Sequence, residues 1–269
     1  MPAPTLPARS RRARTLAACA VPVVALLAVA AFVPLPFSLA QPGSTVDVLG
    51  TEKGAPVITL DGTKSRRTSG ELRMTTIVAT GPHVSVSLAD VVSGWFRTDR
   101  AVMPRDSVYP VGDSDKEVSE HNLAEMKASQ GDATQAALRY LRKSPDEVKV
   151  RLSSGDIGGP SAGLLFTLGI IDKVDGDGRG GDLTGGRTIA GTGTIEPDGT
   201  VGAVGGVPLK TQAAKRDGAT VFLVPKSECS EAQANLPKGL RLVPVTELKD
   251  AVASLRALSA GQQDKVPSC

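Results

Sequence analysis

The 269-residue sequence is poor in aromatic residues, cysteine and histidine. Aromatic side chains make up only 3% of the chain, so a core has to pack mainly with Val, Leu, Ile and Ala. Three Cys and two His are too few for a dense disulfide scaffold or a Cys/His zinc cluster, and we expect no metal site and no cofactor. The net charge of +3 arises from four Arg before residue 41, and the rest of the chain is nearly balanced. This balance argues against a nucleic-acid-binding protein.

Charge is also missing from Thr15 until Asp47. Within this gap, Leu16–Val33 is dominated by Ala, Val and Leu and is close to the minimum length for crossing a bilayer. The Arg cluster before it predicts an N-terminus inside the cell and a body outside the cytoplasm. We therefore predict a basic cytoplasmic tail over residues 1–14 and a transmembrane anchor or signal over residues 15–40.

A cleavable signal peptide is the alternative to a retained anchor. Ser38-Leu39-Ala40 places small residues at suitable spacing before Gln41. The protein would be a single-pass cell-membrane protein in the first case. It would be secreted if cleavage follows Ala40.

Beyond residue 40, short strands alternate with helices, which predicts a mixed α/β or α+β fold. The predicted strands are Val57–Leu60, Leu72–Thr80, Val148–Leu152, Thr188–Ile195, Val201–Val204, Thr220–Val224 and Leu240–Val245. The predicted helices are Ser87–Phe96, Ser114–Arg142 with an interruption near Gly131, an apolar helix ending at Ile171, Val207–Arg216, and Thr246–Leu258 capped by Thr246. We divide the body into an N-terminal α/β region (41–147), a second domain (148–260) and a C-terminal tail (261–269).

Ser161 is the strongest candidate for a catalytic side chain. Gly158-Gly159-Pro160 leads from a strand into an apolar helix, and Pro suits the first helical turn. A Ser in that turn can attack a carbonyl while the backbone N–H groups of Ser161 and Ala162 stabilise the oxyanion. Gly158 and Gly159 would let a substrate backbone approach closely. The alternative is a Ser that only caps the helix.

A base for this Ser is harder to find. His83 lies in a predicted turn and His121 lies on a charged helix, so both are expected to be surface residues. A desolvated Lys can replace His, because burial lowers its pKa. Lys210 is the candidate, since no acid lies between Asp198 and Asp217. An exposed helical Lys is the alternative.

Three ordered blocks make the sequence similar to a known family. They are Asp156–Gly163, Thr192–Ile195 and Asp198–Val207, the last followed by Lys210. Together they resemble the proteolytic domain of Lon proteases, and they are most similar to the membrane-anchored, extracytoplasmic Lon-like proteases of bacteria. The resemblance covers roughly Val148–Leu258.

The resemblance implies a Lon-like proteolytic domain over residues 148–260, which acts on protein or peptide substrates. It implies that Ser161 is the nucleophile and Lys210 the general base of a Ser–Lys dyad, with Thr192 in a supporting role. It also implies a homo-oligomeric ring. Asp156 lies five residues before Ser161, whereas ATP-dependent relatives carry an acid three residues before the nucleophile.

Two departures from the family shape the functional prediction. Only Arg142–Glu147 separates the long helix from the next strand, so the PDZ domain of the anchored relatives does not fit there. No G-x-x-x-x-G-K-[ST] motif is found, because Gly62–Ser65 lacks the upstream Gly. We predict an ATP-independent serine endopeptidase acting outside the cytoplasm on unfolded or flexible proteins.

Two other classes of function remain open from the sequence. One is a catalytically silent, membrane-anchored binding or assembly module with the same fold, which would not need both Ser161 and Lys210. The other is a phosphate-binding protein that uses the Gly-rich helix entry. No cluster of metal-binding carboxylates accompanies that entry.

The cysteines fit an extracytoplasmic body. Cys19 lies in the apolar segment, whereas Cys229 and Cys269 both fall on the outer side of the predicted topology. A disulfide between Cys229 and Cys269 is expected in an oxidising compartment. Two unpaired thiols are the alternative.

Overall fold

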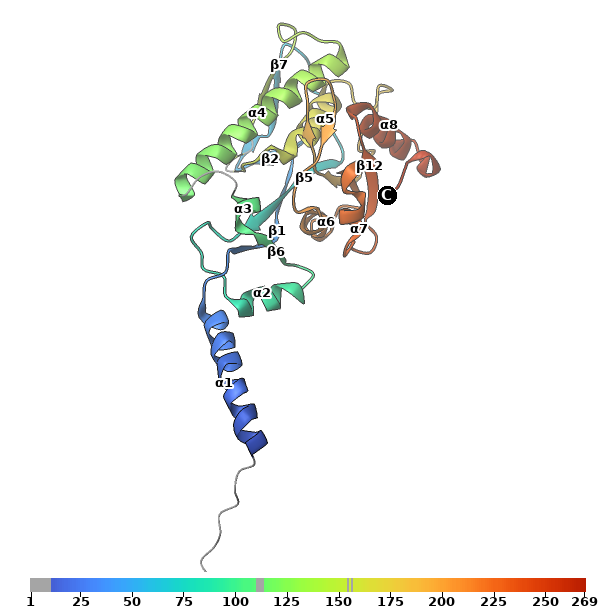
Figure 1. Cartoon of the computed structure of the whole chain (residues 1–269). Coiled ribbons are helices and arrows are strands. Elements are labelled where there is room, and N and C mark those ends of the chain that lie inside the picture. The colour runs from blue at the N-terminus through green and yellow to red at the C-terminus, as the bar shows by residue number, and fades with distance from the viewer. Residues whose placement is uncertain (1–10, 110–113, 154, 156) are drawn as a thin grey trace, which may run out of the picture.

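Strands from both halves of the chain meet in one sheet (Figure 1). The computed structural model describes residues 11–109, 114–153, 155 and 157–269, with the backbone alone described for residues 11–15 and 30–32. The described strands are β1 (Phe37–Asp47), β2 (Thr51–Glu52), β3 (Ala55–Pro56), β4 (Ile58–Asp61), β5 (Glu71–Ala79), β6 (Ala101–Pro104), β7 (Lys149–Leu152), β8 (Thr188–Gly191), β9 (Thr194–Ile195), β10 (Val201–Gly202), β11 (Val221–Pro225) and β12 (Arg241–Val245).

The helices predicted from the sequence are present with similar bounds. The described helices are α1 (Arg11–Phe32), α2 (Leu88–Trp95), α3 (Arg105–Val108), α4 (Asp115–Leu141), α5 (Gly163–Val174), α6 (Val207–Arg216), α7 (Cys229–Gln233) and α8 (Leu248–Ser259), with single 3₁₀ turns η1 (Pro160–Ala162), η2 (Lys226–Glu228) and η3 (Gln263–Lys265). The short helices α3 and α7 were not predicted. The cap of α8 is Glu247 rather than the predicted Thr246, because Glu247 and Asp250 form a reciprocal capping box.

The main sheet has the order β12-β11-β8-β5-β1-β6. The first four strands pair in parallel, whereas β1 runs antiparallel to both β5 and β6. Strands of the predicted N-terminal region and of the predicted second domain therefore share one sheet. The boundary predicted between residues 147 and 148 does not separate two sheets.

Helices cover both faces of this sheet and create two apolar cores. Alternate side chains of a strand point to opposite faces. In β11, Val221 and Leu223 join the core beneath α4, α5 and α8, whereas Phe222 and Val224 join the core beneath α6 and α7. Burial on both faces explains why β11 is a continuous apolar run in the sequence.

The edge of the sheet corrects the predicted bounds of the N-terminal segment. Residues 15–40 were assigned to an anchor or signal, yet Phe37–Ala40 pairs with β6 as part of β1. Ala40 is buried in the sheet. Cleavage after Ala40 would therefore cut β1 and remove the residues that hold β6. This strand was not predicted, because Pro42 and Gly43 interrupt it.

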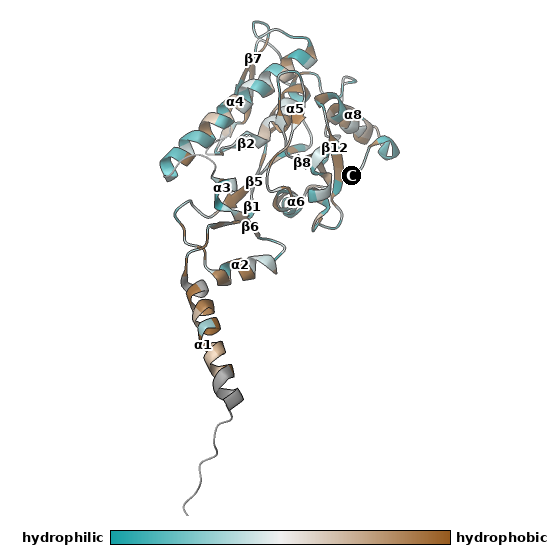
Figure 2. Cartoon of the chain, viewed as in Figure 1, coloured by the Kyte–Doolittle hydropathy of each residue, from teal (hydrophilic) through white to brown (hydrophobic). Residues whose placement is uncertain are grey.

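The uncharged segment itself forms α1, which extends away from the body beside α2 (Figures 1 and 2). Its described large apolar side chains, including Leu16, Val24 and Leu27, are exposed. Among the described residues, no helix is both long enough and apolar enough to cross a membrane. The predicted transmembrane helix therefore has no structural support.

Helix α4 corrects a second prediction, because it is continuous through Gly131. A Gly inside a helix costs about 1 kcal/mol relative to Ala. Packing outweighs this cost, since Met126, Ala133 and Ala137 of α4 are buried in the core that α4 shares with α5. This long helix is the element that later supports the loop of Ser161.

Asp172 on α5 is a fully buried carboxylate. Its Oδ1 accepts the backbone N–H of Leu183 at 2.8 Å, and its Oδ2 has no hydrogen-bond partner among the described residues. Burial raises the pKa of Asp172 to about 6, against the weaker opposing effect of the Leu183 bond. Folding therefore stabilises the protonated form of Asp172 relative to its ionised form.

We predict that Asp172→Asn changes the pH dependence of stability. Because the folded pKa lies above the unfolded value of 3.8, the stabilising contribution of Asp172 is full below the unfolded pKa and is lost as pH rises through about 6. Between pH 5 and pH 8 the wild type should lose about 1 kcal/mol of unfolding free energy relative to the variant. Urea denaturation of both proteins at the two pH values measures this loss. If the unfolding free energies of wild type and variant differ by the same amount at pH 5 and pH 8, the raised pKa of Asp172 is contradicted.

Candidate active site

Ser161 lies where the sequence predicts it, at the entry to the apolar helix. Pro160, Ser161 and Ala162 form η1, which continues directly into α5. Gly159 precedes them with a φ of 87°, a conformation that favours Gly over residues with a Cβ. Ser161 is partly exposed, whereas Ala162 is buried. Ser161 therefore lies near the surface, at the N-terminus of a helix that is otherwise buried in the core.

Helix α4 holds the loop before Ser161. The carbonyl of Asn122 accepts the N–H of Gly159 at 2.9 Å, and Ser129 Oγ donates to the carbonyl of Pro160 at 2.9 Å. A Cβ at Gly158 would lie 2.8 Å from Asn122 Cβ, so α4 leaves room only for Gly there. The sequence did not predict roles for Asn122 or Ser129, because nothing in a helical pattern identifies which distant loop a helix supports.

Thr192 connects the loop of Ser161 to Lys210. The N–H of Gly193 donates to the Ser161 carbonyl at 3.0 Å, and Thr192 Oγ1 donates to the same carbonyl at 3.3 Å. Lys210 Nζ in turn donates to Thr192 Oγ1 at 3.0 Å. The structure thus brings together the three side chains that the sequence singled out. No hydrogen bond between the Ser161 side chain and Lys210 is found in the described part of the chain.

The electrostatic environment of Lys210 is unusual for a lysine. Its side chain is 3% exposed and sits in the first turn of α6, where the helix dipole opposes a positive charge. Burial lowers the pKa of Lys210 to about 8, and the carboxylates of Glu228 and Glu231 oppose that shift. A lysine with this pKa is partly neutral near pH 8 and can accept a proton.

Glu228 is a residue near this site that the sequence did not single out. It is 9% exposed, and its Oε1 accepts the N–H of Val204 at 2.8 Å. Val204 precedes the Gly205-Gly206 turn that starts α6. An acid 18 residues after Lys210 gives no local signal in the sequence, since only the fold brings η2 back to α6.

The other predicted residues are placed as follows. Cys229 and Cys269 form a disulfide, and Cys19 is a free, exposed cysteine on α1. On α4, His121 Nε2 lies 3.4 Å from Glu125 Oε1. Asp156 lies outside the described residues. Within the described residues, no group of three or more His, Cys, Asp or Glu side chains is arranged to hold a metal ion.

A cavity of about 480 Å³ opens beside the Ser161 loop. It lies between β5 and the N-terminal half of α4 and reaches Ile157 and Gly158. Ile77, Val78 and Leu123 supply apolar walls. Ser161 itself does not line the cavity, which reaches only Gly158, three residues earlier in the chain.

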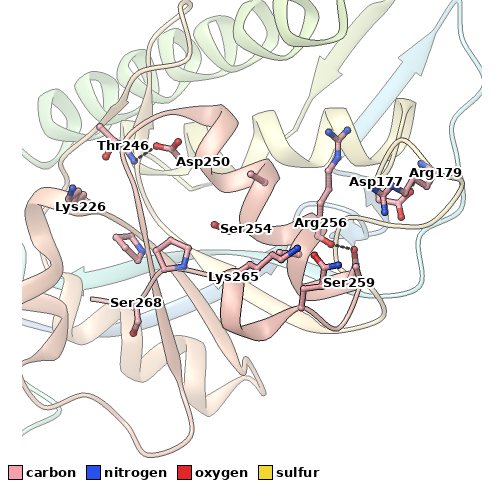
Figure 3. Close-up of a pocket in the computed structure, with 16 residues that line it drawn as sticks. Asp177, Arg179, Lys226, Thr246, Asp250, Ser254, Arg256, Ser259, Lys265 and Ser268 are labelled. Atoms are coloured by element: carbon pink, nitrogen blue, oxygen red, sulfur yellow. Dashed lines mark hydrogen bonds between the residues drawn. The ribbon is translucent and has the colours of Figure 1, made fainter.

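A larger cavity of about 920 Å³ lies elsewhere, between α8 and the C-terminal tail (Figure 3). Ser254 lies on its helical wall and Lys265 on the opposite wall. It is not lined by Ser161, Thr192 or Lys210. The candidate active site therefore lies outside this cavity.

Comparison with known proteins gives a family match over the part of the chain that carries these residues. A family model described as the Lon protease (S16) C-terminal proteolytic domain matches residues 110–257, more than half of the chain. The match includes Ser161, Thr192 and Lys210, and it begins within the region predicted as 41–147. A search of the curated proteins finds no match.

We predict that the Thr192 hydroxyl contributes to the pKa of Lys210. Thr192→Val removes the acceptor of the Nζ hydrogen bond at nearly constant volume, so the ammonium is less stabilised and the pKa should fall below about 8. Thr192→Ser keeps the hydroxyl and should leave the pKa near the wild-type value. NMR titration of the lysine side chains measures both, and an equal pKa in all three proteins would contradict the role of Thr192.

Proposed function

The chain belongs to the Lon protease (S16) family and is a serine peptidase, and on that premise we propose that it is an ATP-independent endopeptidase with a Ser161–Lys210 dyad. Its proposed substrates are unfolded or flexible proteins outside the cytoplasm. The observation that carries the proposal is the chain of contacts from the buried Lys210 amine through the Thr192 hydroxyl to the Ser161 carbonyl.

The proposed reaction begins with neutral Lys210. Its Nζ takes the proton from Ser161 Oγ while Oγ bonds to the carbonyl carbon of the substrate, whose oxygen becomes an oxyanion. The N–H groups of Ser161 and Ala162 are the proposed donors to that oxyanion, since N–H groups in the first turn of a helix lack helical partners. Pro160 has no N–H and cannot donate.

Collapse of this intermediate breaks the C–N bond of the substrate. The leaving amine takes the proton from the Lys210 ammonium, and Ser161 is left as an acyl ester. Water then loses a proton to Lys210 and attacks the carbonyl carbon of the ester. As the ester C–O bond breaks, the Lys210 ammonium returns the proton to Ser161 Oγ, which releases the carboxylic acid and restores both residues. The dyad needs no cofactor for this cycle.

The substrate class is inferred from the shape of the site. Ser161 is partly exposed, and the cavity that reaches Gly158 has apolar walls from Ile77, Val78 and Leu123 beside polar ones from Thr76, Ser119 and Asn122. An extended chain carrying an apolar side chain near the scissile bond fits this arrangement. These 269 residues contain no phosphate-binding G-x-x-x-x-G-K-[ST] motif, which supports cleavage without ATP.

The proposed location outside the cytoplasm is supported by the disulfide of Cys229 with Cys269, because disulfides persist in oxidising compartments. Membrane attachment through α1 is part of the proposal on the sequence pattern of Arg residues followed by an uncharged segment. The exposed apolar side chains of α1 are compatible with a lipid or protein partner. Assembly into a ring stays a prediction.

The alternative is a membrane-anchored binding or assembly module that keeps the fold without catalysis. The burial of Lys210 argues against it. A lysine that serves no chemical purpose would be expected to keep its ammonium in water, because burying a charge is costly.

We predict that Ser161→Ala and Lys210→Met each abolish cleavage of an unfolded model protein by the full chain without ATP. Loss of either dyad member should reduce kcat/KM by about a thousandfold or more. Lys215→Met on the same helix removes an exposed cation and is the matched control, expected to cleave at the wild-type rate. Circular dichroism verifies folding, and equal cleavage by all four proteins would contradict the dyad.

We also predict the pH dependence of cleavage. Only neutral Lys210 can accept the Ser161 proton, so kcat/KM should fall about tenfold per pH unit below about pH 8. Initial rates between pH 6 and pH 9 with one peptide substrate measure this limb. Rates independent of pH between 6 and 8 would contradict Lys210 as the base.

A further inference from the structure

Glu228 carries a buried carboxylate oxygen that the protein leaves without a hydrogen bond. Its Oε1 accepts the N–H of Val204, but its Oε2 is buried and has no partner among the described residues. Burial of an unpaired carboxylate oxygen is unfavourable unless a nearby positive charge compensates it. Burial also raises the pKa of Glu228, and the charge of Lys210 opposes this shift.

Few charges act on Lys210. Glu228 has the stronger effect of the two carboxylates that stabilise its ammonium form, and Glu231 on α7 the weaker. The charged residues of β1 and β5, strands that also pack against α6, act on one another and on Asp217; they are Asp47, Glu71 and Arg73. Among the described residues, Glu228 is therefore the carboxylate that most favours the ammonium form of Lys210.

The bond from Val204 to Glu228 also fixes the start of the helix that carries Lys210. Val204 is followed by Gly205 and by Gly206, which caps α6 in a left-handed conformation with φ of 70°. The carbonyl of Gly206 accepts the N–H of Lys210 at 3.1 Å. Displacement of Val204 would move this turn and with it the Lys210 backbone.

The position of Glu228 is itself constrained. It ends η2, directly after the interior strand β11, and the next residue, Cys229, is bonded to Cys269 of the tail. Both cysteines pack against the apolar core beneath α6, which holds the end of η2 in place. Glu228 can thus act on Lys210 from a fixed place.

We propose that Glu228 is a positioning residue for Lys210: its carboxylate holds the turn before α6 and stabilises the ammonium that forms when Lys210 takes the Ser161 proton. This inference rests on the proposed function. The step is a transfer of one proton from Ser161 Oγ to Lys210 Nζ, and the negative charge moves to the substrate oxyanion. Glu228 stays ionised and lowers the energy of the cation without exchanging a proton.

The test compares Glu228→Gln with Glu231→Gln in the full chain. Gln at position 228 keeps an acceptor for the Val204 N–H but removes the charge, so the acid limb of kcat/KM should move to lower pH by about one unit. The rate on the alkaline plateau should fall by up to about tenfold, because the ammonium formed in the reaction is less stabilised. Glu231→Gln removes an exposed carboxylate from the neighbouring α7 and should give a smaller shift.

A second pair of variants separates charge from shape. Glu228→Asp keeps the charge, so the acid limb of kcat/KM should return to the wild-type pH. Glu228→Ala removes both the charge and the hydrogen-bond acceptor, so the alkaline plateau of kcat/KM should fall further. The proposal would be overturned if Glu228→Gln lowers only the melting temperature and leaves the acid limb of kcat/KM at the wild-type pH. It would assign Glu228 a purely structural role.

An NMR titration of Lys210 tests the same inference without activity. Glu228→Gln should lower the pKa of Lys210 relative to the wild type, and an unchanged pKa would overturn the role of Glu228. If Glu228→Gln lowers the pKa of Lys210 as expected but Lys210→Met still cleaves at the full rate, the proposed dyad is overturned instead. The two failures are therefore distinguishable.

Discussion

The burial of one amine, Lys210 Nζ, is the constraint on which the site depends. Desolvation favours the neutral amine, and the Thr192 hydroxyl supplies the hydrogen bond that this amine needs inside the protein. The negative charge of Glu228 offsets part of the effect of desolvation on the pKa of Lys210, which stays near 8. A base with that pKa can take a proton from a serine and return it to a leaving amine under mildly alkaline conditions.

The fold supplies this environment by joining elements that are distant in sequence. Thr192 directly follows β8, a strand inside the main sheet, and its backbone N–H donates to the carbonyl of Leu223 in β11. Lys210 comes from α6 on one face of that sheet, whereas Ser161 comes from the start of α5 on the other. The loop of Ser161 is held by α4 through Ser129. The sheet is thus the frame against which both members of the proposed dyad are positioned.

The local parts of this arrangement could be predicted from the sequence, because local signals determine them. Pro160 after two Gly residues marks the start of a helix, and Val207–Arg216 forms the predicted helix. The long-range parts could not. The pairing of β1, the support from Ser129 and the approach of Glu228 depend on tertiary contacts that leave no periodic pattern. The interruption predicted at Gly131 was wrong because core packing outweighs the intrinsic helix propensity of one residue.

The most direct test of the account is to identify the nucleophile by covalent labelling. The full chain would be treated with a serine-reactive fluorophosphonate near pH 8, digested, and mapped by mass spectrometry. The account predicts one adduct, on Ser161, that forms in the wild type and is lost in a folded Lys210→Met variant. An adduct on another residue, or labelling of Ser161 that is equally fast without Lys210, would contradict the Ser161–Lys210 dyad.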